Sequence, residues 1–224
     1  MLLSYEKLRS AFFMCVGHAL VWLISYFRSK KWDLFLEILR PTANCKVLDV
    51  GFSESEYRPT DNLIEKKYPY PERLTALGIQ KPAEFSRRYP KVKAVTYDGN
   101  IFPFKRHDFD LCWSNAVIEH VGDRRSQAQF LKEIKRVSKR SFVTTPNRLF
   151  PIEVHTRVLF LHMFPKRLFD EFLKFVGKEW ATGHYMNLLT YNDLKSLMRM
   201  AGIWDYRVIR NKLLFFTVEL IVVF

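Results

Sequence analysis

The stretch KVLDVGFSES, residues 46–55, decides the fold of this 224-residue chain. Its first part, Lys46–Gly51, is a short apolar run that ends in glycine, which is typical of a buried parallel strand followed by a tight turn. Further strand-like runs follow, and helix-like runs separate them. This alternation predicts an α/β domain with a doubly wound, mainly parallel sheet. The other expected strands are Arg73–Ile79, Val92–Thr96, Phe109–Ser114, Ser141–Thr145 and a C-terminal antiparallel pair from Ile203–Ile209 and Leu213–Phe224.

Amphipathic patterns predict helices at Asp123–Val137 and around Leu168–Val176. A further helix is expected to begin at a capping box of Thr190 and Asp193 and to end at Gly202. By contrast, Phe52–Pro71 is polar and interrupted by prolines, so we expect a long loop with a short helix at 61–67. Loops of that length in compact domains are usually functional.

The composition suits one globular domain, with 48% hydrophobic residues and a formal net charge of +13. An excess of positive charge favours phosphate-bearing or anionic-membrane partners, and it also serves solubility. The cysteines Cys15, Cys45 and Cys112 show no metal or CxxC spacing, which indicates a reduced, cytoplasmic compartment.

The N-terminal run Ala11–Phe27 is strongly apolar and is followed by Arg28, Lys30 and Lys31. A spanning helix needs roughly 20 apolar residues, so this run is marginal, and it lacks a signal-peptide cleavage site. We divide the chain into an N-terminal helical segment, residues 1–40, and an α/β domain, residues 41–224. Three interpretations of the segment remain: a buried lid, a helix lying on the inner face of a membrane, or a true anchor.

Polar and small residues follow three of the predicted strands where those strands end. The carboxyl ends of parallel strands meet at one edge of the sheet, and ligands bind there where the strand order reverses. The pattern therefore predicts a nucleoside site at this edge, although each residue alone also suits an ordinary turn. The residues are Asp49, Gly51 and Ser53 after the first strand, Asp98 and Gly99 after the third, and Asn115, Ala116, Glu119 and His120 after the fourth.

In order and spacing, VLDVG, the acid Asp98 and the EHV segment at 119–121 resemble the motifs of class I S-adenosylmethionine-dependent methyltransferases. The resemblance covers roughly Cys45–Asn147. It implies S-adenosylmethionine as the cofactor. By this resemblance Asp49, Gly51 and Ser53 would line its methionine and ribose side, Asp98 and Gly99 would meet the adenine, and Asn115 and Ala116 would lie under the sulfonium.

Two positions depart from the family pattern. The glycine-rich turn reads Phe52-Ser53-Glu54-Ser55, and Gly78 stands where an acid usually binds the ribose hydroxyls. We hypothesise that Asp61, Asn62 or Glu65 from the long loop replaces that acid. The alternative is a cofactor site that has decayed.

Candidate catalytic residues are His120 and its neighbour Glu119. Some relatives bind Mg²⁺ here with two glutamates and a histidine, but Ala116 stands in place of the first glutamate, so no metal site is predicted. His120 is then a general base or a substrate contact. Candidate substrate-binding residues follow the fifth strand: Asn147, Glu153 and His155.

The leading hypothesis is methyl transfer to an oxygen or nitrogen of a small acceptor, with cell-envelope, glycan or lipid-linked molecules as the expected classes. The rival is a catalytically silent, methyltransferase-like binding module associated with a membrane or a protein partner. Nucleic acid is the least favoured partner because the basic residues are dispersed and no recognised nucleic-acid module is present.

Overall fold

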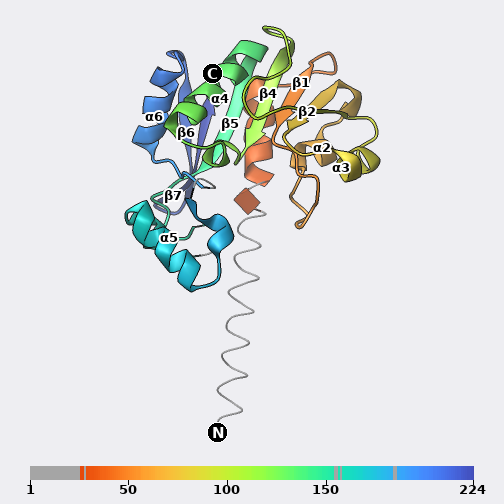
Figure 1. Cartoon of the computed structure of the whole chain (residues 1–224). Helices are drawn as coiled ribbons and strands as arrows, with labels where there is room; N and C mark the ends of the chain where they lie inside the picture. Colours follow the sequence, from red (N-terminus) through yellow and green to blue (C-terminus); the bar gives the residue numbers. More distant parts are fainter. Residues whose placement is uncertain (1–25, 28, 154–155, 157, 184–185) are drawn as a thin grey trace.

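A 7-stranded sheet in the order β3-β2-β1-β4-β5-β7-β6 forms the centre of the molecule (Figure 1). The structure, a computed structural model, describes residues 26–27, 29–153, 156, 158–183 and 186–224. β1 to β5 pair in parallel, and β7 runs antiparallel to both β5 and β6. The predicted fold class is therefore confirmed. The strands are β1 (Val47–Val50), β2 (Leu74–Gly78), β3 (Lys93–Thr96), β4 (Phe109–Asn115), β5 (Ser138–Pro146), β6 (Arg207–Leu213) and β7 (Phe216–Val223).

The helices begin where the sequence supplies caps. Asp123 accepts hydrogen bonds from the backbone N–H groups of Arg125 and Ser126 at the start of α4, and the expected capping box of Thr190 and Asp193 is present at the start of α6. The α-helices are α2 (Leu63–Lys67), α3 (Ala83–Arg88), α4 (Arg124–Val137), α5 (Lys166–Phe175), α6 (Tyr191–Met200) and an N-terminal helix whose described residues are 26–27 and 29–39.

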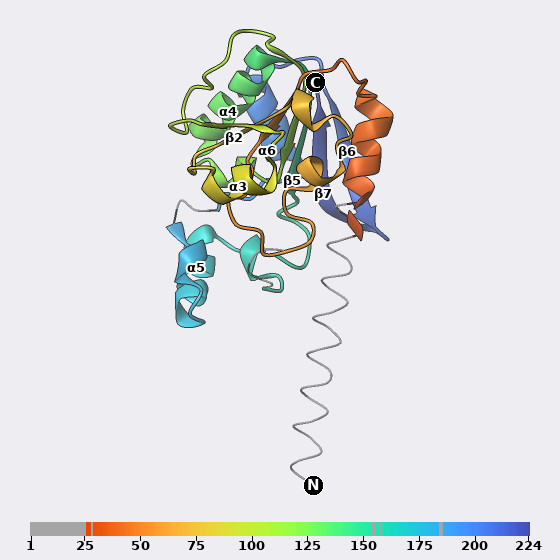
Figure 2. The same ribbon diagram turned by 90° about the vertical axis from the view of Figure 1, so that its right-hand side faces the viewer.

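Each face of the sheet has its own core. On one face, α4 and α6 pack Leu131, Ile134 and Leu197 against alternate residues of the central strands. On the other, the N-terminal helix, α2 and α3 cover the sheet, and the ring of Trp113 stacks on that of Phe142 at a centroid distance of 5.3 Å. Figure 2 shows α4 and the N-terminal helix on opposite sides of the sheet.

The described part of the N-terminal segment is thus a helix docked on the sheet. Its side chains Trp32, Phe35 and Leu39 are buried in the second core. None of the helices in the described part of the chain is long and apolar enough to cross a membrane. Residues 1–25, which contain most of the apolar N-terminal run, lie outside the described residues.

Three predicted strand boundaries are wrong, and one of them is the start of the last strand, which was expected at Leu213 but lies at Phe216. The first strand of the C-terminal pair was expected at Ile203–Ile209, but the observed strand, β6, spans Arg207–Leu213. The tight turn at Leu214 and Phe215 sets the register of β6 with β7, so the paired residues lie closer to the C-terminus than expected. β5 begins three residues earlier than expected, since it leaves α4 without a loop, and it includes Pro146.

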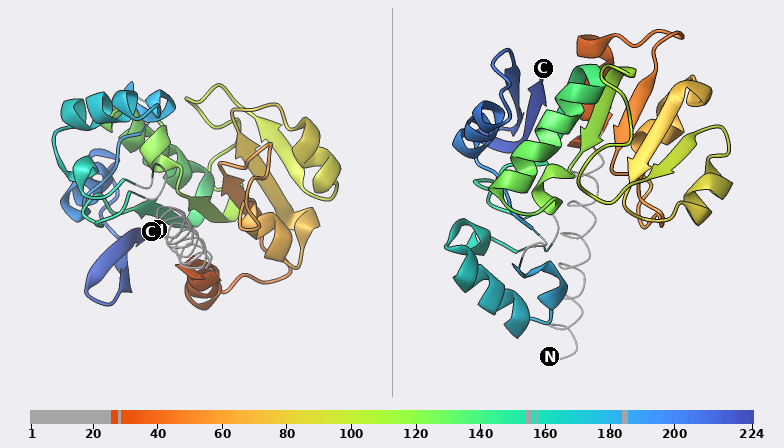
Figure 3. Two further views of the ribbon diagram at one scale, coloured as in Figure 1. Left: turned by 90° about the horizontal axis from the view of Figure 1, so that it is seen from below. Right: turned by 45° about the horizontal axis from the view of Figure 1, so that its top comes forward.

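Residues between β5 and α6 form a lobe beyond the carboxyl end of β5 (Figures 1 and 3). The lobe contains α5 and has a small core of its own around Phe169, Leu173 and Met186. The strand order reverses between β1 and β4. The connections that follow these two neighbouring strands therefore lead to opposite halves of the sheet and leave a space at the carboxyl ends of the strands. The edge of the sheet beside the lobe is therefore the place for a ligand.

We predict that Phe35→Ala lowers the free energy of unfolding by about 3–5 kcal/mol, because the side chain is fully buried against Trp113 and Phe142. Chemical denaturation monitored by tryptophan fluorescence measures this change. The matched control is Leu36→Ala on the same helix, where the side chain is 36% exposed and the expected loss is under about 1 kcal/mol. Equal losses would show that the helix is not docked through Phe35.

Candidate cofactor and acceptor site

Two cavities meet at the carboxyl ends of β1 and β4. The larger, which we call the large cleft, has a volume of about 690 Å³ and is lined by residues 50–52, 77–80, 97–99, 117 and 120–122. The smaller, which we call the polar cavity, has a volume of about 160 Å³ and is lined by residues 49, 51, 53, 60–65, 113 and 115–117. Gly51 and Val117 line both cavities.

Gly51 brings the two turns into contact. Its φ of +106° belongs to the left-handed region, and a Cβ placed on it would lie 2.2 Å from Cγ2 of Val117. Only glycine therefore lets the turn after β1 approach the turn after β4 this closely. On the other side of the contact, Ala116 has a φ of +58°, which is a strained conformation for a residue with a side chain.

The polar cavity contains two buried carboxyl groups, Asp49 at the end of β1 and Glu65 on α2. Burial, together with the negative charge of Glu65, raises the pKa of Asp49 well above its usual range, and burial raises the pKa of Glu65 to about 7. Among the described residues, no N–H or O–H donor hydrogen-bonds either oxygen of Glu65. Two adjacent buried acids share a proton until a cation replaces it, so this cavity suits a positively charged group.

Asn115 forms part of the wall of the polar cavity, and its side chain is fixed from below. Its Oδ1 accepts hydrogen bonds from Nζ of Lys31 at 2.7 Å and from Oγ1 of Thr144 at 2.9 Å. Lys31, on the N-terminal helix, is buried and also forms an ion pair with Glu219 at 2.7 Å. The N-terminal helix thus supports the site, which the pattern of the sequence alone does not predict.

Phe52 explains both departures from the family pattern. Its ring is buried against Phe85, at a centroid distance of 4.5 Å, and a Cβ placed on Gly78 would lie 2.6 Å from Cε1 of Phe52. The ring therefore occupies the space that a side chain at residue 78 would need. The degraded glycine turn and the missing acid are one structural change, in which an aromatic ring fills the end of the large cleft.

The long loop is fastened to itself by the residues that were expected to replace the missing acid. Asn62 accepts a hydrogen bond from the backbone N–H of Ser53 at 2.8 Å and donates one to the Ser53 carbonyl at 2.8 Å. Asp61 accepts hydrogen bonds from the backbone N–H groups of Tyr57 and Arg58. Glu65 faces Asp49 in the polar cavity, away from Gly78.

Asp98 and Gly99 lie in the turn after β3 and line the large cleft opposite the Gly51 turn. Oδ1 of Asp98 accepts a hydrogen bond from the backbone N–H of Asn100 at 2.9 Å. Hydrogen bonds from Asn100 hold the pKa of Asp98 below its ordinary value. The exposed carboxylate is therefore ionised and available to accept a hydrogen bond from a ligand amino group.

Glu119 and His120 occupy η2 (Ile118–His120), but they lie in different surroundings. Glu119 is fully buried, and its Oε2 accepts a hydrogen bond from Oγ1 of Thr145 at 3.0 Å. The side chain of His120 is 25% exposed and lines the large cleft, with its Nε2 4.0 Å from Oε1 of Glu119. The cleft thus has an imidazole at its wall and a buried carboxylate behind it.

Of the three candidate substrate residues, the structure describes Asn147 and Glu153. Nδ2 of Asn147 donates to the carbonyl of Thr217 at 2.8 Å, and Oε2 of buried Glu153 accepts hydrogen bonds from the backbone N–H and hydroxyl of Thr156. Both line a narrow crevice, together with residues such as Phe150 and Val218, rather than the large cleft. His155 lies outside the described residues.

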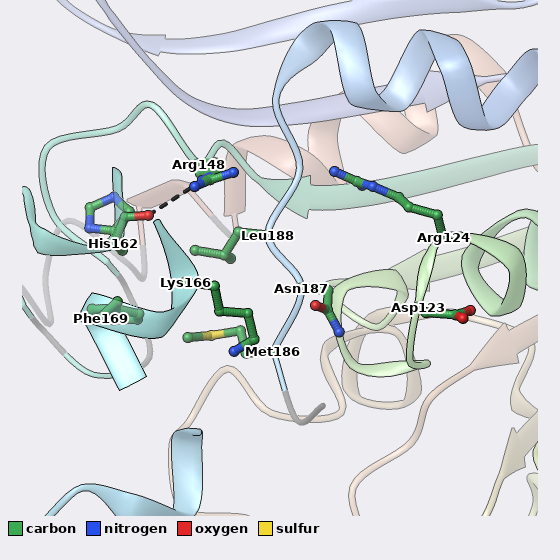
Figure 4. A pocket seen from close by; sticks show the side chains of 9 residues that line it. All are labelled: Asp123, Arg124, Arg148, His162, Lys166, Phe169, Met186, Asn187 and Leu188. Atoms are coloured by element: carbon green, nitrogen blue, oxygen red, sulfur yellow. Dashed lines mark hydrogen bonds between the residues drawn. The ribbon is translucent and has the colours of Figure 1, made fainter. Parts of the chain in front are cut away.

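A further pocket of about 220 Å³, which we call the basic pocket, lies between the lobe and the start of α4 (Figure 4). Figure 4 shows the side chain of Arg124 extending toward the side of the pocket where Arg148 lies, while Arg148 is hydrogen-bonded to His162 and the Lys166 side chain ends beside Met186. Arg124 pairs with Asp193 and Lys166 with Asp170, whereas Arg148 donates to the carbonyl oxygens of His162 and Phe164. The sequence pattern does not predict this pocket, because its residues are far apart in the chain.

The basic pocket adjoins the large cleft. Its lining residue Asn187 donates from its backbone N–H to the carbonyl of Glu119 at 2.7 Å and from Nδ2 to the carbonyl of Gly122 at 2.9 Å. The segment 119–122 therefore has the basic pocket on one side and the large cleft on the other.

The fold and a stretch of the sequence both resemble known methyltransferases. Residues 63–141 match the family model of a methyltransferase domain. Similar solved structures include S-adenosylmethionine-dependent methyltransferases from Aquifex aeolicus (16% identity, TM-score 0.52, 88% of this chain and 96% of that one) and from Mesorhizobium loti (11%, 0.54, 84% and 94%). The DszA carbon methyltransferase is also similar (15%, 0.56, 89% and 53%).

This chain spans about half the length of the CurJ and DszA structures. No functionally characterised protein sequence matches it.

The fold and the match at residues 63–141 agree with the class expected from the sequence, the class I S-adenosylmethionine-dependent methyltransferases, and with the cofactor which that class uses.

The residues at the site suit the methionine and adenine ends of this cofactor, but they depart from the family pattern where the ribose is usually held. The buried carboxyl pair of Asp49 and Glu65 in the polar cavity suits an ammonium group such as that of the methionine moiety. Asp98 and Gly99 would hold the adenine. At residue 78, where the family has its ribose-binding acid, the ring of Phe52 fills the space of the side chain.

We predict that Gly78→Asp alone destabilises the protein by about 1–3 kcal/mol, since the new side chain overlaps the ring of Phe52. Combined with Phe52→Cys, the same Asp gains room to accept hydrogen bonds from the ribose. The double variant should bind S-adenosylmethionine about tenfold more tightly than Phe52→Cys alone. Thermal unfolding and isothermal titration calorimetry measure the two effects. If Gly78→Asp alone is stable and binds more tightly, Phe52 does not occupy the acid's space.

The carboxyl pair predicts a dependence on pH. Because the pKa of Glu65 rises from 4.5 to about 7 on folding, the folded protein binds more protons in this window, and the free energy of unfolding falls as the pH rises through it. A ligand ammonium replaces the shared proton, so cofactor affinity rises over the same window. Glu56 and Lys66 also face Glu65, and their opposite charges offset one another in part.

In Glu65→Gln, both the free energy of unfolding and the cofactor affinity should depend less on pH. Denaturation and titration with S-adenosylhomocysteine, each at about pH 5.5 and about pH 7, measure the two effects. The matched control is Glu84→Gln, whose side chain lies at the exposed surface of α3. An unchanged pH profile in Glu65→Gln would exclude the shared proton.

Proposed function

We propose that this methyltransferase transfers the methyl group of S-adenosylmethionine to an oxygen or nitrogen of a small, lipid-linked acceptor that carries an anionic group. The observation that carries the proposal is the basic pocket beside the large cleft. Arg148 enters this pocket with hydrogen bonds to carbonyl oxygens and with no carboxylate partner among the described residues. Its guanidinium charge is therefore the one best placed for a phosphate or carboxylate of the acceptor.

The protein's part in the reaction is mainly to position the reactants. When bound, S-adenosylmethionine supplies an electrophilic methyl group, so the chain needs only to align the acceptor and to exclude water. Asp49 and Glu65 would hold the methionine end, and Asp98 would hold the adenine. Asn115, fixed by Lys31 and Thr144, keeps the turn after β4 in place between them.

His120 would take the proton from the acceptor. Deprotonation helps when the acceptor is a hydroxyl or an amine, and His120 is the imidazole at the wall of the large cleft. The carboxylate of Glu119 lies behind its ring, with Oε1 4.0 Å from Nε2 of His120. Glu119 is thus a positioning residue, and it is held in turn by Thr145.

A lipid-linked acceptor would bring the enzyme to the inner face of a membrane. The apolar run at 11–27 and the basic residues that follow it support peripheral contact there, as does the net charge of +13.

A methyl-transfer assay with radiolabelled S-adenosylmethionine and anionic lipid-linked acceptors tests the proposal. We expect His120→Gln to lower kcat by about 10²-fold or more, whereas Arg148→Gln should raise KM for the acceptor and leave cofactor affinity unchanged. The control is Arg87→Gln, an exposed arginine of α3 that lines none of the cavities described above. Failure of the wild-type chain to bind S-adenosylmethionine or S-adenosylhomocysteine at millimolar concentration would contradict the enzymatic function.

A further inference from the structure

The turn between β6 and β7 presents a row of bare apolar side chains. Leu214 is 81% exposed, Phe215 93% and Phe216 51%. Single exposed apolar residues are common, but three in succession at a hairpin tip are costly in water unless something covers them. We refer to these three residues as the apolar tip.

The apolar tip lies at the same edge of the sheet as the cofactor site. In the register of the strands, the start of β7 pairs toward the end of β5, with Glu219 opposite Pro146. The opposite end of this hairpin, at Arg207, lies level with Phe142 in the middle of β5. The tip therefore projects beyond the carboxyl ends of the parallel strands.

The N-terminal helix enters the domain beside the tip. Phe27 is buried in a small cluster with Phe150 and Val218, and Leu213 packs against the same cluster. Figures 1 and 2 show the described start of this helix at the lower end of the sheet, near the hairpin. The described part of the N-terminal helix thus begins next to the apolar tip.

The lobe adds apolar and basic side chains on this side of the molecule. Phe160 and Phe164 are each more than half exposed, and Leu168 of α5 is 61% exposed. Exposed basic residues accompany them, including Lys212 next to the tip and Arg167 on α5. Apolar side chains surrounded by lysine and arginine are the composition of surfaces that bind anionic lipid.

We propose that the apolar tip and the exposed residues of the lobe form a docking surface for an anionic phospholipid bilayer. Leu214 and Phe215 insert among the acyl chains, and the neighbouring basic side chains pair with lipid phosphates. A second copy of this chain is a poorer occupant, because each copy carries a net charge of +13 and would bring like charges together. The inference extends the membrane contact proposed above from the N-terminal segment to the folded domain.

Flotation of the full chain with vesicles of phosphatidylcholine, with and without about 30% phosphatidylglycerol, tests the proposal. We expect binding to the anionic vesicles, weakened by salt, and a loss of about tenfold or more in Leu214→Ser/Phe215→Ser. The matched control is Trp204→Ser, because Trp204 is 73% exposed but precedes β6 at the opposite edge of the sheet. Unchanged thermal unfolding shows that the variants are folded.

Three results would overturn the proposal: vesicle binding by the double variant equal to that of wild type, equal loss in Trp204→Ser, or no vesicle binding by the wild-type chain. A wild-type dimer in sedimentation that the double variant converts to a monomer, without vesicle binding, would assign the surface to a second copy. Titration with S-adenosylhomocysteine in the absence of lipid separates this outcome from failure of the catalytic proposal, since the tip lies outside both cofactor cavities.

Discussion

The contact between Gly51 and Val117 is the constraint on which the rest of the site depends. It joins the turn after β1 to the turn after β4 at the point where the strand order reverses. With no side chain at residue 51, the two turns approach closely, and a cavity is left on each side of the contact. One cavity is polar and anionic, and the other is large and bounded by Asp98 and His120. A cofactor with a cationic end and an aromatic end fits this division.

Around that contact, this chain has rearranged the support of the site. An aromatic ring, Phe52, fills the space that a side chain at residue 78 would need, so under the proposed function less of the binding energy would come from the ribose hydroxyls and more from the two ends of the cofactor. The floor of the polar cavity is held by Lys31, whose buried ammonium links Asn115 to Glu219. The N-terminal helix is consequently part of the site and not an appendage to the domain.

Much of the fold follows from local pattern in the sequence. Apolar runs ending in small residues indicate parallel strands, and parallel strands bring Asp49, Asp98 and Asn115 to one edge whatever the loops do. The features that escaped prediction depend on distant contacts. Lys31 meets partners 84 and 188 residues away, and the ring of Phe52 meets Gly78 on the next strand. The basic pocket likewise combines α4, the segment after β5 and α5, which no periodicity relates.

A crystal structure of the full chain with S-adenosylhomocysteine tests the central claim most directly. We expect the ligand to straddle Gly51, with its ammonium between Asp49 and Glu65, its adenine beside Asp98 and Gly99, and the ring of Phe52 still packed against Gly78. A ligand bound away from the Gly51–Val117 contact, or one whose ribose is held by a carboxylate after displacement of Phe52, would contradict this claim.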